Sequence, residues 1–144
     1  MLLYDMKKAL LDAFNSANAI VPPLAVTDVN FTNISLIIQN ECNSRVTIQT
    51  LPTCLTWSGS KQIYYTRRNI ATALADVVLP RALGPYTDTD KVCKVLWDVY
   101  GISAYHEDFL TATYPVGATS IQLSVQLNAL VWLPGEVVTL QIVD

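Results

Sequence analysis

Charged side chains are scarce in this chain of 144 residues. Asp, Glu, Lys and Arg make up 15% of it and hydrophobic residues 51%, whereas an ordinary soluble domain carries about 25% charged residues. A single domain of this size keeps many polar side chains on a large solvated surface. The shortage therefore favours a protein whose surface is partly covered by neighbouring proteins. The alternative is a soluble monomer with a neutral surface rich in Thr, Asn and Gln.

Basic residues are also few, and they form no stripe. Lys and Arg number 9 against 12 Asp and Glu, so the formal net charge is −3. Nucleic-acid binding takes much of its affinity from clustered Lys and Arg side chains that contact phosphates. We therefore expect no nucleic-acid partner.

A uniformly apolar segment is missing as well. Residues 109–135 contain no charged side chain and are long enough to cross a bilayer. However, Ile121, Leu123 and Val125 alternate with Gln122 and Ser124, which is the two-residue period of a half-buried strand. We expect no membrane span. The amphipathic, charged start of the chain does not resemble a signal peptide either.

The three cysteines, Cys42, Cys54 and Cys93, are odd in number and widely spaced. This pattern fits neither a disulfide framework nor the short Cys spacings of a zinc site. We interpret them as reduced thiols of a protein that assembles in a cytosolic environment. A disulfide to another chain is the alternative.

Residues that support catalysis are nearly absent. The glycines stand singly, so there is no phosphate-binding loop. His106 is the only histidine, and its neighbours Glu107 and Asp108 make this the best place for a metal or a general base. Adjacent side chains point in different directions and further ligands are missing, so we interpret the trio as a solvated turn. We predict no enzyme, catalytic residue, metal or cofactor; a small hydrolase built on His106 is a rival hypothesis.

The N-terminal segment has the spacing of an amphipathic helix. Leu3, Met6, Leu10 and Phe14 recur on one face, and Val21-Pro22-Pro23 ends the helix because proline lacks an N–H and restricts the residue before it. We expect residues 1–21 to form a helix and a stiff hinge. We expect this helix to dock on the domain that follows or on a neighbouring protein. We further hypothesise that the apolar stripe contacts a neighbouring protein.

The rest of the chain, 24–144, predicts a single α+β domain. Alternating and β-branched segments indicate strands, and a bulge near Thr32-Asn33 would keep the first strand facing one way. The expected strands are 29–38, 45–49, 61–68, 121–127 and 138–142. A short helix is expected at 70–75 and a longer one at 88–100. We predict one antiparallel sheet packed against the longer helix.

Local signals support both helices. Asn69 offers an N-cap to the short helix, Asp88 offers one to the long helix, and Gly101 supplies a left-handed stop. The stripe of the long helix is Val92, Val95, Leu96 and Val99, and we expect Trp97, one position away, to lie in the core.

Arg67 and Arg68 follow two tyrosines on a predicted strand, so their side chains point to opposite faces. We expect one of them to be partly buried and paired with a carboxylate; ordinary exposure at a strand end is the alternative. Trp57 and Trp132 lie beside turns and could anchor an interface. The predicted interface residues are Leu3, Met6, Leu10, Phe14, Trp57, Arg67, Arg68 and Trp132.

Several short motifs occur in a suggestive order from about Asn33 to the C-terminus. They are IYYTRRNI at 63–70, VLWDVYGI at 95–102, EDF at 107–109 and a closing segment from Tyr114-Pro115 through 121–127 and 128–132 to the last strand. In this order they resemble a small α+β domain found in virion structural and tail-fibre proteins of large-genome tailed bacteriophages.

The resemblance implies a non-enzymatic virion structural protein that is assembled in the host cytoplasm. Its place would be the tail, baseplate, neck, collar or a fibre attachment, and its partners other virion proteins and copies of itself. One alternative is a tail-fibre module that binds host glycans through Tyr64, Tyr105 and Trp132. The other is a capsid decoration protein.

Overall fold

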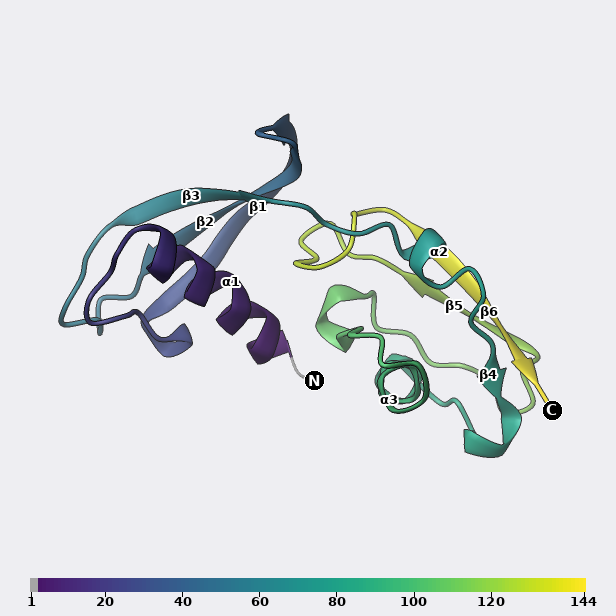
Figure 1. Cartoon of the computed structure of the whole chain (residues 1–144). Coiled ribbons are helices and arrows are strands. Elements are labelled where there is room, and N and C mark those ends of the chain that lie inside the picture. The colour runs from purple at the N-terminus through teal and green to yellow at the C-terminus, as the bar shows by residue number, and fades with distance from the viewer. Residues whose placement is uncertain (1–2) are drawn as a thin grey trace. The chain divides into compact units, whose positions relative to one another are not determined.

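The computed structural model describes the backbone of residues 3–144 and the side chains from residue 7 onwards. It confirms the α+β class. The chain forms two compact units, the first ending at Arg67 and the second running from Arg68 to Asp144 (Figure 1). Each unit has a sheet of its own, whereas the sequence had suggested one sheet for the whole domain.

The first unit is a helix on a three-stranded antiparallel sheet. It contains α1 (Leu3–Ala17), β1 (Val29–Gln39), β2 (Cys42–Thr50) and β3 (Ser60–Tyr65), with the strand order β1-β2-β3. A short 3-10 turn, Val26–Asp28, leads into β1. The predicted bulge is confirmed, because the β1–β2 register shifts between Thr32 and Ser35 and Asn33 has a φ of 53°.

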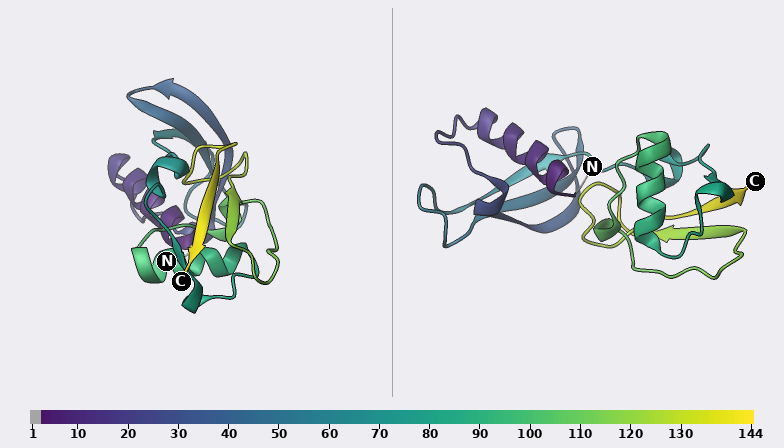
Figure 2. Two further views of the ribbon diagram at one scale, coloured as in Figure 1. Left: turned by 90° about the vertical axis from the view of Figure 1, so that its right-hand side faces the viewer. Right: turned by 90° about the horizontal axis from the view of Figure 1, so that it is seen from below.

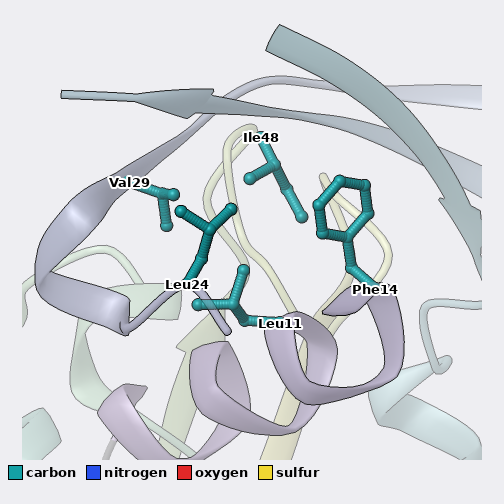
Figure 3. Close-up of a cluster of buried hydrophobic side chains, with 5 residues drawn as sticks. All are labelled: Leu11, Phe14, Leu24, Val29 and Ile48. Atoms are coloured by element: carbon teal, nitrogen blue, oxygen red, sulfur yellow. The ribbon is translucent and has the colours of Figure 1, made fainter. Parts of the chain in front are cut away.

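Side chains of α1 form the core of the first unit with one face of the sheet. Leu11 and Phe14 point from the helix toward Leu24, Val29 and Ile48, as Figure 3 shows. Leu11 is only 1% exposed. Because this face needs the helix to exclude water, α1 is part of the first unit.

The Pro-Pro step folds the chain back onto α1. The side chain of Asn15 accepts a hydrogen bond from the Leu24 N–H (3.2 Å) and donates one to the Leu24 carbonyl (2.9 Å). The indole of Trp57 donates to the Pro22 carbonyl at 3.0 Å. The expected division into a helix-and-hinge segment 1–21 and a domain 24–144 therefore differs from the structure, in which burial of α1 places the boundary after Arg67.

The second unit combines a small mixed sheet with short helices. Its strands are β4 (Leu79–Pro80), β5 (Ser120–Ser124) and β6 (Val137–Val143), in the order β4-β6-β5. β5 and β6 are antiparallel, as predicted for the last two strands, and β4 runs parallel to β6 (Figure 2). The helices are α2 (Ile70–Ala73) and α3 (Thr89–Tyr100), with 3-10 turns at Arg81–Leu83 and His106–Asp108.

The helix signals of the second unit are confirmed. Asn69 accepts a hydrogen bond from the Thr72 N–H and Asp88 accepts one from the Lys91 N–H, while Gly101 has a φ of 65°. The prediction for Trp97 is wrong: its side chain is 38% exposed. It lies five residues after Val92, about 140° around the helix from that buried position.

The second core is larger than the first. Its most completely buried side chains are Ile70, Leu74, Leu79, Val92, Leu96, Phe109, Leu123, Trp132 and Leu140. They come from α2, α3, the sheet and the segments between them. Along the described residues, every helix is too short or too polar to span a membrane.

We predict that Leu11→Ala destabilises the first unit by about 2–5 kcal/mol, because a fully buried leucine leaves a cavity when it is shortened. Urea unfolding followed by hydrogen exchange of residues 29–50 measures the effect. Asp12→Ala, on the exposed side of the same helix, is the matched control and should change stability by less than about 0.5 kcal/mol. Equal behaviour of the two variants would mean that α1 is a detached arm.

Candidate functional site

The His-Glu-Asp trio is divided between surface and interior. His106 Nδ1 lies 3.2 Å from Asp90 Oδ1 and 3.4 Å from Glu107 Oε2, and all three side chains are about half exposed or more. Within the described part of the chain, no three or more His, Cys, Asp or Glu side chains are grouped as metal ligands would be.

Asp108 has a different surrounding from its two neighbours. Its side chain is 2% exposed, and its carboxylate accepts hydrogen bonds from the N–H groups of Leu130 (2.9 Å) and Val131 (3.0 Å). A buried carboxylate with two backbone donors holds a loop in place. The sequence pattern gave no sign of this, since the donors are more than twenty residues away.

Arg67 is the buried member of the arginine pair, as expected for one of the two. It is 1% exposed. The Arg67 side chain donates from Nε to Ser44 Oγ at 2.6 Å. Its backbone N–H donates to Asn43 Oδ1 at 2.7 Å, and its backbone carbonyl accepts from Asn43 Nδ2 at 2.8 Å. These bonds hold the last residue of the first unit against β2.

Arg68 and Trp132, both predicted as interface residues, lie together in the second unit. The Arg68 guanidinium lies 5.2 Å from the centre of the Trp132 ring, a cation–π distance. The Arg68 N–H donates to the Val131 carbonyl, and the Arg68 carbonyl accepts from the Leu133 N–H. Trp132 is fully buried, so its ring is a core residue and the interface prediction for it is corrected.

The helix stripe is also divided. Phe14 is buried in the core of the first unit, so it is unavailable to a neighbouring protein, whereas Leu10 is half-buried on the adjoining flank. The side chains of Leu3 and Met6 lie outside the described residues. Trp57 is 39% exposed. Of the aromatics suggested for glycan binding, Tyr105 is buried like Trp132 and Tyr64 is half-buried.

Both edges of the second sheet are capped by groups of the same unit. On β5, the Ser124 carbonyl accepts from the Leu110 N–H and the Gln122 carbonyl accepts from the Tyr114 hydroxyl. Beside β4, the Tyr86 hydroxyl donates to the Pro80 carbonyl. Such caps keep a sheet edge from pairing with another chain.

The two edges of the first sheet differ from each other. The β1 edge is broken by the bulge at Asn33 and by a second register shift between Leu36 and Gln39, which makes it a poor template. β3 is regular, since its six residues pair with β2 without a shift from Ser60 to Tyr65. Among residues 3–144, no strand pairs with its other side.

A largely apolar groove of about 520 Å³ follows this open strand. One wall is the α1 flank with Leu10, Ala13 and Ala17, and the other is β3 with Ile63 and Tyr65. At one end it includes Asn40 and Cys42 of the β1–β2 hairpin. We call β3, this flank and this hairpin end the β3 surface. It is the candidate functional site.

The hairpin carries further exposed apolar side chains. Ile38 is 94% exposed and Leu36 is 60% exposed. The contact residues predicted on the helix included Leu10 but not Ala13 or Ala17. Their spacing of three and seven residues from Leu10 places all three on one flank of the helix. This spacing was the only sequence feature that could have indicated them.

The cysteines have contrasting environments. Burial raises the pKa of the Cys93 thiol to about 12, and nearby carboxylates act in the same direction. At Cys54 a hydrogen bond from the Trp57 backbone lowers the pKa of a half-buried thiol. All three cysteines are free in the structure, and an intermolecular disulfide stays an untested alternative.

Comparison with known proteins identifies a family. The model of a family of unknown function, DUF7941, matches residues 1–142, which covers both units. Neither the curated proteins nor the solved structures contain a match to this chain.

We predict that Asp108→Ala lowers the free energy of unfolding by about 2–4 kcal/mol, because two buried N–H groups lose their acceptor. His106→Ala should change it by less than about 0.5 kcal/mol, because that side chain is exposed. Chemical denaturation of the two variants gives the comparison. A large decrease in the free energy of unfolding of His106→Ala would contradict the conclusion that Asp108 alone stabilises this turn.

We predict that iodoacetamide modifies Cys54 in the folded protein and Cys93 only after unfolding. With a pKa of about 12, Cys93 is thiolate in roughly one molecule in ten thousand at pH 8, and only the thiolate reacts. Because its pKa is lowered, the labelling rate at Cys54 should begin to rise at a lower pH than the rate at an ordinary thiol. Mass spectrometry of timed samples, with and without urea, tests this; comparable labelling of both thiols without urea would refute it.

Proposed function

This chain belongs to DUF7941, a family of unknown function. We propose that it is a non-enzymatic structural subunit of a tailed-bacteriophage particle. It acts by protein–protein assembly in the tail, baseplate, neck, collar or a fibre attachment, with other virion proteins and copies of itself as partners. The motif order between residues 63 and 132 supports the phage assignment.

The contrast between the two sheets carries the assembly part of the proposal. The second sheet has side-chain and backbone caps on both edges, whereas β3 is regular and open. An open strand offers a row of N–H and C=O groups to another chain. The groove beside it adds apolar surface that a partner would remove from water.

The low charge supports the same function. Only Lys61 is charged among the residues that line the groove. Interface centres are depleted in charged residues, because removing an ion from water costs free energy unless it is paired. Leu36 and Ile38, exposed on the adjoining hairpin, extend the apolar area.

Glycan binding at the host surface is the second candidate function, and a pocket of about 320 Å³ in the second unit favours it. Tyr86 and Tyr114 line this pocket with Arg81 and Thr87. The Tyr114 hydroxyl is bound to a backbone carbonyl, which holds its half-buried ring in place for stacking. The Tyr86 ring is itself buried, and its hydroxyl is bound to the Pro80 carbonyl. Burial raises the pKa of both tyrosines, which keeps them neutral. Binding of the isolated chain to a glycan array would favour this function over assembly.

We predict that the protein occurs in purified particles at a defined copy number and that replacing both Leu36 and Ile38 by Ser reduces its incorporation at least tenfold. Removing the exposed apolar pair weakens contacts without opening the core. Complementation of a deletion mutant, followed by quantitative mass spectrometry of particles, measures both. Val116→Ser, at an equally exposed apolar side chain of the second unit, is the matched control. Absence of the wild-type chain from particles would reject the proposed function.

A further inference from the structure

We infer that the β3 surface binds a second copy of the same chain, with β3 paired to β3 across a two-fold axis at Ile63. The two three-stranded sheets then form one continuous antiparallel sheet. This inference rests on the proposed assembly function and identifies the partner at that surface.

The hydrogen bonds of β3 show which backbone groups are free to pair. The Thr50 N–H donates to the Gly59 carbonyl at 3.0 Å, and β2 and β3 continue without a register shift from there to Tyr65. In an antiparallel ladder, alternate residues direct both backbone groups to the same neighbour. Residues 61, 63 and 65 therefore face β2, while the N–H and C=O groups of Gln62 and Tyr64 face the open edge.

This alternation selects a self-complementary register. Gln62 of one copy exchanges backbone hydrogen bonds with Tyr64 of the other, so Ile63 lies opposite itself. Lys61, the only charged residue of β3, then lies opposite Tyr65. Like charges directly opposite each other destabilise a sheet, and this register keeps the two Lys61 positions four residues apart, about 13 Å along the strand.

The ammonium group of Lys61 has a hydrogen-bond partner within its own copy. Its ammonium donates a hydrogen bond to Asn18 Oδ1 at 2.7 Å, near the end of α1. The groups that pair are flanked by an amide and aromatic rings, and the one charge of the groove is hydrogen-bonded at its end within the same copy. An edge without like-charge conflict fits its own copy.

The α1 flank fits the same symmetry. A two-fold axis perpendicular to the sheet keeps the helix-covered faces of both copies on the same side, so each groove faces the other. α1 and β3 run in opposite directions (Figure 1), and Asn18 meets Lys61 at one end. From Asn18 to Leu10 the helix rises about 12 Å, close to the span of β3 from Lys61 to Tyr65. Ala13 therefore falls near the axis.

A small side chain at that position lets the two helices approach each other. Ala13 and Ala17 are exposed and Leu10 is half-buried in the single chain. In the pair, the flank of each copy covers the apolar groove of the other. Formation of the dimer then pairs the two β3 strands and, at the same time, buries the groove between α1 and β3 of each copy.

Sedimentation velocity of the full chain gives the first test. The wild type should be a dimer, and Gln62→Pro should raise the dissociation constant at least tenfold, because proline removes an outward N–H and is tolerated on the free side of an edge strand. Gln62→Ala keeps the N–H and should stay dimeric. Circular dichroism confirms that both variants are folded. A monomeric wild type, or a Gln62→Pro variant that associates normally, overturns the inference.

Disulfide cross-linking tests the register. In a background of Cys42→Ser and Cys54→Ser, oxidised Ile63→Cys should form a covalent dimer, since facing residues of a non-hydrogen-bonded pair are about 4.5 Å apart at Cα, within disulfide reach. Lys61→Cys should not cross-link with itself. Cross-linking of Lys61→Cys instead, or of neither variant, overturns this register.

The two proposals fail in different ways. A chain that is monomeric in solution yet present in particles overturns self-pairing and leaves the structural role standing, with a strand of another virion protein as the occupant. A dimeric chain that is absent from particles rejects the virion role and leaves the pairing.

Discussion

The burial of α1 on one face of the first sheet is the contact on which the rest of the first unit depends. Leu11 and Phe14 exclude water from Val29 and Ile48, and a three-stranded sheet needs such a cover to be stable. The helix has only one buried stripe, so its flank with Leu10, Ala13 and Ala17 is left beside β3. The same packing that makes the unit stable thus creates this apolar groove.

The two units treat their sheet edges in opposite ways. In the second unit, tyrosine hydroxyls and a backbone N–H satisfy the outer carbonyls of β4 and β5, so this sheet ends within its own chain. In the first unit, bulges disturb β1 but β3 stays regular. A protein that only had to remain soluble would gain by closing both sheets. The difference is the physical basis for the proposal that the first unit mediates assembly.

Side chains that define local structure were predictable. The caps at Asn69 and Asp88, the stop at Gly101 and the bulge at Asn33 act within a few residues of sequence, so their patterns suffice. The burial or exposure of Trp97, Trp132 and Phe14 could not be predicted in the same way, because it depends on residues far away along the chain. Asp108 shows the limit most clearly, since an apparent surface acid binds two amides of a distant loop.

By itself, the sequence determined the α+β class, the helices, most strands and the low charge that points to covered surfaces. These features follow from periodicity, which is read within a short segment, and from composition, which is counted over the whole chain. Only the tertiary structure decided that α1 joins the first sheet, that the chain divides after Arg67 and that β3 is the open edge. Those features depend on which strands become neighbours, and strand pairing between distant segments leaves no fixed spacing in the sequence.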